Sequence, residues 1–504
     1  MAKSLKSPDK YRWAPLLFFT LIGLFSVSWD SLWIDEFMTY KYASIVNIND
    51  MFLSMYEDKC SEVQMPFYVI YMWAYTKIFG IGEFALRASA LPFFICGMTA
   101  LATTLHRRFG SYLPIVIGYG LSPFICYYLN EARPYAIQIG LSALILASLI
   151  RLNEEAENDS TKIQRSHKRW LNIFCVAVLL LSGISMLCQL WVWAAILAAI
   201  FILPKQRLIF LIREKKLVLA ATGVGLLGIG FYYLWSLTIG ALAATTESPN
   251  VFSIIFIFYE QLGLTGTGPG RAELREEGAR AILPFLIQLI IHSVLIGSVF
   301  VFGCVYLLRE CRKKTIVSVV VCVSIPIVLI LGAGILMEFR VLGRHFAPLA
   351  VAIFLVFSCG IKLLVEKRNK WSITLVTLFV IFQASSCVLV RFEARHKRDN
   401  YRLAASLANQ ALTQNKTVWW NANPIGATYY QLPQPQSDSS EKFTVVINPS
   451  AQNLEERSLP DLVITSKTDI FDNQMALAQF LGANGYVSTQ EIHSFVFWER
   501  PVSP

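Results

Sequence analysis

Two adjacent carboxylates, Asp35 and Glu36, follow the first long apolar run of the chain, which spans residues 14–29. A carboxylate can act as a general base that removes the proton from an acceptor hydroxyl group. Considered alone, two acids beside an apolar run are better explained as hydrated side chains at a membrane surface. They become candidates for catalysis because other charged residues are predicted to reach the same membrane face.

Several basic residues fall in segments that are predicted to lie on the same side of the membrane as Asp35 and Glu36. Arginine suits phosphate because its planar guanidinium group donates paired hydrogen bonds and stays charged. Acids and arginines together at the lipid–water boundary indicate a substrate that is part lipid and part phosphate, such as a lipid-phosphate sugar. The basic residues are Arg87, Arg133, Arg271, Arg275, Arg340, Arg344 and His345.

These basic residues also have structural explanations. Arg87 can anchor a helix at the lipid headgroups, because it stands just before an apolar run. Arg133 can pair with Glu131 in the same turn, and His345 alone is more often structural than catalytic. The glycine-rich stretch 266–270 lacks the Lys-Ser/Thr ending of a Walker phosphate loop and is better explained as an ordinary loop.

The elements that must position these residues are those of a polytopic membrane protein. The 504 residues are 55% hydrophobic and 15% charged, with a mean hydropathy of +0.51, whereas soluble proteins are about a quarter charged. The apolar runs lack the alternation of a β-barrel, so helices are predicted. The net charge of +10 is distributed in short clusters between apolar runs, which indicates membrane topology and no nucleic-acid partner. Ten cysteines without a CxxC pair argue against a disulfide framework and against a zinc site.

The apolar runs predict about eleven transmembrane helices within residues 1–390. The short loops assigned to the inside carry more than twice as many Lys and Arg residues as the outer loops, as the positive-inside rule requires. This distribution predicts a multi-pass protein of the inner (plasma) membrane with a cytoplasmic N-terminus. Two long outer loops, 30–87 and 239–281, are expected to carry most of the candidate site.

The C-terminal segment, residues 391–504, is polar and is predicted to form a small α/β domain outside the membrane. It begins with a helical pattern at 400–412, and a second helix-like stretch covers 473–481. Short runs of β-forming residues alternate with these helices, which is the pattern of an α/β domain. The predicted strands cover 417–420, 443–447, 462–465 and 495–498.

Five segments resemble motifs of the GT-C superfamily of membrane glycosyltransferases. The closest likeness is to bacterial members related to protein O-mannosyltransferases and to the lipid A aminoarabinose transferases. The likeness is strong over 30–150, moderate near 335–350, and limited to layout in the tail. The segments are Trp33-Ile34-Asp35-Glu36, Gln64-Met65-Pro66-Phe67-Tyr68, residues 79–87 (FGIGEFALR), residues 130–135 (NEARPY) and residues 343–348 (GRHFAP).

The resemblance implies a GT-C-like fold and transfer of a sugar from a polyprenyl-phosphate donor on the outer face of the membrane, with inversion at the anomeric carbon. Position by position, it makes Asp35 the catalytic base, Glu36 its supporting acid and Glu131 a further catalytic candidate. The candidates for contacts with the donor phosphate are Arg87, Arg133, Arg271, Arg344, His345 and Tyr135.

One motif departs from the family pattern. The family often has a basic residue before a Pro-Pro pair, whereas this chain has Gln64-Met65-Pro66. The departure weakens any role for a basic group there, so no metal ligand is predicted, and the need for a divalent ion stays open. Likeness of fold does not fix the acceptor, which can be a lipid, a glycan or a protein.

Two alternatives come from other functional classes. A transporter or flippase of lipid-linked saccharides usually shows internal repeats and helices broken near the membrane midplane. This chain instead concentrates charge at one face and has two long outer loops. A structural protein that displays the outer domain would not need Asp35 and Glu36 together with Glu131 and Arg133.

Overall fold

The computed structural model describes residues 11, 13–154, 160–239, 248–433 and 442–501, and it divides the chain into two compact units. The first, here called the membrane unit, comprises Met1–Ser28, Ile45–Gly80 and Phe84–His396. The second, here called the sheet unit, comprises Trp29–Ser44, Ile81–Glu83 and Lys397–Pro504. The segment that carries Asp35 and Glu36 therefore belongs to the same unit as the C-terminal domain.

Eight helical segments of the described chain are long and apolar enough to cross a membrane. A ninth crossing results if α11 (Cys188–Ile202) and α12 (Lys205–Glu214), which are bent by 119°, form one span. The eight segments are α5–α6 (Glu83–Ala88 and Leu91–Phe109), α9 (Tyr135–Asn153), α10 (Ser160–Ile184), α13 (Lys216–Thr238), η3–α16 (Gly278–Phe285 and Leu286–Glu310), α17 (Lys313–Leu336), η4–α18 (Gly343–Phe346 and Ala347–Lys367) and α19 (Lys370–Phe392).

The other predicted spans contain shorter helices. The first apolar run forms α1 (Ala14–Ser26), which has 13 residues. The run at 112–128 forms α7 (Leu113–Gly120) and α8 (Pro123–Leu129), because the chain leaves the helix at Leu121 and restarts at Ser122, whose side chain caps α8. The apolar run at 170–203 is divided by a turn between α10 and α11.

Close packing of α6 against α9 holds the middle of the membrane unit together. A Cβ atom on Gly97 would lie 1.8 Å from the carbonyl oxygen of Gly140, so both positions require glycine. Small residues at a helix crossing allow the two backbones to approach each other. The two helices begin next to candidate site residues, since α6 follows Arg87 and α9 starts at Tyr135.

Short helices form the long loops of the membrane unit. The first loop contains α3 (Ile48–Asp58), η1 (Ser61–Gln64) and α4 (Pro66–Phe79), and α4 is rich in aromatic residues. The second contains α14 (Val251–Gln261), η2 (Leu264–Gly266) and α15 (Arg271–Glu276). A last turn, η5 (Ala394–His396), follows α19.

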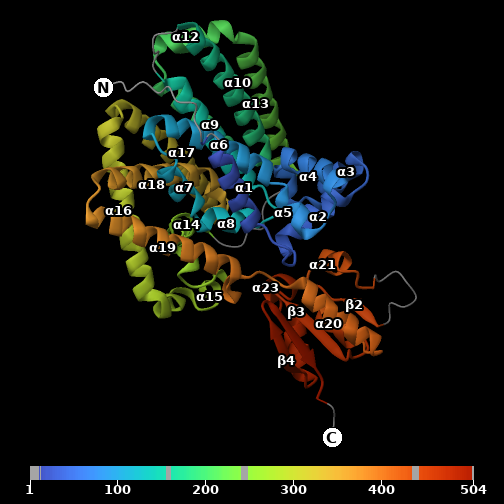
Figure 1. The fold of residues 1–504 in the computed structure, drawn as a ribbon. Coiled ribbons are helices and arrows are strands. Elements are labelled where there is room, and N and C mark those ends of the chain that lie inside the picture. Colours follow the sequence, from blue (N-terminus) through green and yellow to red (C-terminus); the bar gives the residue numbers. More distant parts are fainter. Residues whose placement is uncertain (1–10, 12, 155–159, 240–247, 434–441, 502–504) are drawn as a thin grey trace. The chain divides into compact units, whose positions relative to one another are not determined.

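The sheet unit contains a five-stranded mixed sheet (Figure 1). Its strand order is β2-β1-β3-β5-β4. The first three strands are parallel, and β5 is antiparallel to both of its neighbours. Trp419 and Trp420 point to opposite faces, so Trp419 packs with Leu454 and Leu477 while Trp420 packs near Tyr401. The strands are β1 (Val418–Asn421), β2 (Phe443–Val445), β3 (Leu462–Ser466), β4 (Val487–Ile492) and β5 (Phe495–Glu499).

The remaining elements of the sheet unit are helices. One of them, α2 (Ile34–Ser44), comes from the N-terminal part of the chain. The helices of the C-terminal segment are α20 (Tyr401–Thr413), α21 (Pro424–Tyr429), α22 (Ala451–Glu455), α23 (Thr468–Phe471) and α24 (Ala476–Ala483).

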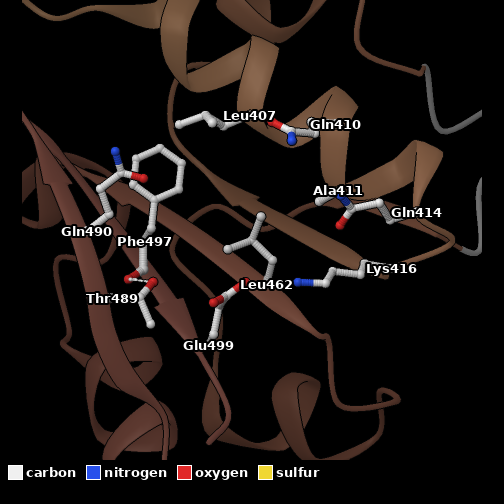
Figure 2. A pocket seen from close by; sticks show the side chains of 10 residues that line it. All are labelled: Leu407, Gln410, Ala411, Gln414, Lys416, Leu462, Thr489, Gln490, Phe497 and Glu499. Carbon is white, nitrogen blue, oxygen red and sulfur yellow. Dashed lines mark hydrogen bonds and ion pairs between the residues drawn. The ribbon is translucent and has the colours of Figure 1, made fainter. Parts of the chain in front are cut away.

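A small groove lies between the C-terminal half of α20 and the strands β3, β4 and β5 (Figure 2). Its volume is about 160 Å³. An ion pair between Lys416 Nζ and Glu499 Oε1, 3.1 Å apart, closes one side. The groove is lined by Leu407, Gln410, Ala411, Gln414, Lys416, Leu462, Thr489, Gln490, Phe497 and Glu499.

Candidate functional site

The two adjacent carboxylates occupy the first turn of α2. The backbone N–H of Trp33 donates a hydrogen bond of 3.2 Å to Glu36 Oε2, so Glu36 closes the N-terminus of its own helix. Glu36 is fully buried, whereas Asp35 is half-buried. Negative charge is favourable at this end of a helix because the backbone N–H groups point towards it. Because Asp35 is less buried than Glu36, it is the more accessible carboxylate of the pair.

Arg87 lies at the end of α5 and is 1% exposed. Its Nη1 donates hydrogen bonds of 3.2 Å both to the carbonyl oxygen and to the hydroxyl of Ser28. These bonds tie α5 to the residues that follow α1. These two hydrogen bonds, together with the burial of the side chain, favour a positioning role for Arg87.

Arg133 forms a buried ion pair with Glu62, a residue that the sequence did not single out. The distance from Nη1 to Glu62 Oε1 is 2.6 Å, and the two side chains are 8% and 1% exposed. The pair joins η1 to the turn that follows α8. Glu62 lies 71 residues from Arg133 in the sequence, so this pair is made by the fold and not by the local motif.

Arg271 begins α15 and lies among acids and tyrosines. It forms an ion pair with Glu260 Oε1, and its Nη2 donates a 2.7 Å hydrogen bond to the hydroxyl of Tyr128. Its Cζ lies 4.2 Å from the ring centroid of Tyr127. Burial lowers the pKa of the Arg271 guanidinium group, whereas the nearby charges of Glu260 and Glu131 raise it. The raising effects are larger together, so the pKa lies well above its usual value. Arg271 is therefore charged at any ordinary pH.

Arg344 approaches the same tyrosines from η4. Its Cζ lies 5.7 Å from the ring of Tyr135, and the rings of Tyr135 and Tyr128 are 5.3 Å apart. Gln261 Nε2 donates to the carbonyl oxygen of Gly343 at 3.1 Å, which attaches η4 to the end of α14. Since α14 also carries Glu260, one short helix positions both arginines. We call Arg271, Arg344, Tyr127, Tyr128 and Tyr135 the arginine–tyrosine cluster.

The remaining predicted residues take different places. His345 Nδ1 accepts a 3.2 Å hydrogen bond from the backbone N–H of Leu342, so it caps its own turn. Glu131 is fully buried in the turn between α8 and α9. Sequence inspection missed Glu260, although a single acid at the end of the apolar helix α14 is the kind of signal that marks a buried partner. The described ranges contain no group of three His, Cys, Asp or Glu residues that could hold a metal ion.

Most of the chain matches a solved structure of ArnT from Cupriavidus metallidurans in the apo state. The TM-score is 0.51 at 13% identity, and the match covers 96% of this chain and 97% of that chain. A structure of ArnT from the same organism bound to undecaprenyl phosphate gives a TM-score of 0.46 at 12% identity, with 97% and 98% covered. No protein-family model and no curated protein matches the sequence. The chain is thus a polytopic α-helical membrane protein with a C-terminal sheet domain and the fold of ArnT, which confirms at the level of fold the resemblance carried by its motifs.

Proposed function

We propose that this protein is an inverting glycosyltransferase that moves a sugar from a polyprenyl-phosphate donor to an acceptor at the outer face of the membrane. The observation that carries the proposal is the arginine–tyrosine cluster in a chain with the ArnT fold. ArnT itself has been solved bound to undecaprenyl phosphate.

The cluster has the chemistry that a leaving phosphate needs. Glu260 is 2% exposed and lies behind Arg271, whose side chain is 32% exposed. A buried acid of this kind orients the guanidinium group and leaves its accessible edge for a second anion. Arg344, on the neighbouring tyrosine, supplies a second positive charge. Positive charges placed in advance stabilise the negative charge that develops on a departing phosphate.

Asp35 is proposed as the general base. Its carboxylate takes the proton of an acceptor hydroxyl while the acceptor oxygen attacks the anomeric carbon of the donor. The bond between that carbon and the phosphate oxygen breaks, and polyprenyl phosphate leaves with the bonding electron pair. Attack opposite to the leaving group inverts the configuration of the anomeric carbon.

The test is release of polyprenyl phosphate by purified protein from a panel of polyprenyl-phosphate sugars. Asp35→Asn should lower turnover on the order of 100-fold, because amides do not act as general bases. Asp50→Asn is the matched control, since Asp50 also lies in the first turn of a helix, α3, and is exposed. Equal turnover in wild type and Asp35→Asn would remove Asp35 as the base. If no donor turns over while lipid-linked saccharides are flipped in vesicles, the protein is a transporter instead.

A further inference from the structure

The helix that carries Asp35 is held by the C-terminal domain. Residues 29–44 cluster with residues 81–83 and with 397–504, although more than 350 residues separate the first and the last of these segments in the chain. Membership in a compact unit shows proximity only. Hydrogen bonds and ring contacts make the attachment specific.

Tyr430 binds the chain just before α2. Its hydroxyl accepts a 3.1 Å hydrogen bond from the backbone N–H of Leu32 and lies 3.1 Å from the hydroxyl of Ser31. The same hydroxyl donates to Glu83 Oε1 at 3.2 Å. One tyrosine hydroxyl therefore connects two N-terminal segments to the C-terminal domain.

Arg402 binds the same segments through both its backbone and its side chain. Its backbone N–H donates to the hydroxyl of Ser31 at 3.1 Å. Its Nη2 donates to the carbonyl oxygen of Trp29 at 2.8 Å and to Glu83 Oε1 at 2.6 Å. Hydrogen bonds from a charged donor are stronger than neutral ones, so Arg402 limits the movement of the chain entering α2.

Aromatic packing fixes the body of α2. Phe37 is fully buried, and its ring meets the ring of Tyr401 edge-on with centroids 4.8 Å apart. One turn further along, Tyr40 meets Tyr429 in the same way at 4.7 Å. A Cβ atom on Gly426 would lie 2.9 Å from the Phe37 ring, so α21 can approach α2 this closely only with glycine at that position.

Trp33 fixes the start of α2. Arg398 Cζ lies 5.0 Å from the centre of its ring, and Lys467 Nζ lies 5.6 Å from it. Lys467 is itself held by Asp399 Oδ2 at 2.5 Å. Asp35 lies two residues after Trp33 and two residues before Phe37, and residues of the C-terminal domain fix both of these aromatic side chains.

We propose that Tyr430 and Arg402 are positioning residues that set the placement of Asp35, and that the C-terminal domain is the support of the proposed base. The inference rests on the proposed function. A displacement of about 1 Å at a catalytic group can lower a rate substantially, so a support of this kind has a direct kinetic consequence.

Tyr430→Phe tests this role because it keeps the ring and removes the hydroxyl. The matched control is Tyr486→Phe, since the Tyr486 hydroxyl donates a 2.6 Å bond to the carbonyl oxygen of Pro460 in the core of the same unit. In sugar-transfer assays, Tyr430→Phe should lower kcat on the order of 10-fold and leave the KM for the donor unchanged. Tyr486→Phe should leave both constants near wild type.

Arg402→Gln provides a second test with its own control. Lys416→Gln breaks the ion pair with Glu499 in the same unit, and Lys416 lies beyond the other end of α20. Arg402→Gln should lower kcat with an unchanged KM, whereas Lys416→Gln should not. If the two variants of either matched pair show the same kcat, or if KM alone changes, the positioning role is wrong.

Hydrogen exchange separates failure of this inference from failure of the proposed function. Tyr430→Phe should speed amide exchange in residues 29–44, and Tyr486→Phe should not. If wild type transfers no sugar from any donor, the proposed function fails, and exchange alone decides whether the domain supports α2. If exchange accelerates while kcat stays at the wild-type value, the domain holds α2 without positioning a catalytic group.

Discussion

A more deeply buried acid stands behind two of the candidate arginines. Glu62 is 1% exposed beside Arg133 at 8%, and Glu260 is 2% exposed beside Arg271 at 32%. Buried ion pairs contribute little net stability because both charges lose their hydration. They do orient the planar guanidinium group, which is what recognition of a phosphate requires.

Removal of one partner from the Arg271–Glu260 pair should destabilise the protein. Arg271→Ala leaves the Glu260 carboxylate buried without its partner, and such a change typically lowers the free energy of unfolding by about 3 kcal/mol. Arg271→Ala combined with Glu260→Gln should recover part of this loss, because the buried group is then neutral. Thermal unfolding of the purified variants measures both effects. If Arg271→Ala alone is as stable as wild type, the result contradicts the ion pair.

The stability of the protein should depend on His396 between about pH 4 and 6.5. Burial, followed by the charge of Arg395, lowers the pKa of His396 to about 4, and Arg395 Nε donates to His396 Nε2 at 3.1 Å. Between these pH values the unfolded chain binds a proton that the folded chain does not. Stability should therefore fall as pH decreases from 6.5 to 4, by up to about 3 kcal/mol.

Chemical denaturation across this pH range measures the dependence on His396. His396→Asn should flatten the profile, because asparagine does not titrate. His493→Asn is the control, since His493 is exposed and adopts a positive φ of 51° that asparagine tolerates. An unchanged slope in His396→Asn would show that other groups cause the pH dependence.

At the scale of elements, the crossing of α6 and α9 determines where two site segments begin. Arg87 lies in α5, just before α6 begins, and Tyr135 is the first residue of α9. The glycine contact between Gly97 and Gly140 is a backbone-to-backbone approach, which no side-chain rotation can relieve. Any larger residue must separate the helices and shift both segments.

Gly97→Ala should therefore destabilise the protein even though alanine favours helices. The added Cβ atom would overlap the Gly140 carbonyl, and overpacking of this kind lowers stability by about 1–3 kcal/mol or more. Gly223→Ala is the matched control, because it lies in α13 with nothing within 4 Å of a new Cβ atom. That control should be neutral or slightly stabilising. Similar unfolding temperatures for both variants would contradict the close approach.

At the scale of the whole molecule, the two units are interleaved in the sequence. The chain passes from one unit to the other after Ser28, Ser44, Gly80, Glu83 and His396. Both ends of the chain must therefore be present before the sheet unit is complete. Such long-range contacts slow folding, because distant segments must meet before they stabilise each other.

Reporter fusions should reveal the orientation that the charge distribution predicts. A reporter enzyme that folds only outside the cytoplasm should be active when fused after Pro504. The same reporter should be inactive when fused in the loop at 311–312 between α16 and α17, a region rich in Lys and Arg. Activity only at the internal position would reverse the proposed topology. Activity at both positions would exclude it.

Local sequence patterns were sufficient to predict the membrane class, the positions of the long helices and four of the five strands. An apolar run of about 20 residues already has the length of a membrane crossing, whatever the rest of the chain does. The fifth strand, β4, was not predicted because it is an exposed edge strand whose sequence, VSTQEI, lacks apolar alternation. The break between α7 and α8 was likewise hidden inside one apolar run.

The pairing of distant residues, by contrast, became visible only in the folded chain. The Tyr430 hydroxyl binds the backbone of Leu32 across 398 residues, and Arg133 pairs with Glu62 across 71 residues. No local pattern encodes such pairs, because each follows from how whole helices and strands pack against one another. For the same reason, the sequence located Asp35 beside a membrane span, while the tertiary fold attached its helix to the C-terminal domain.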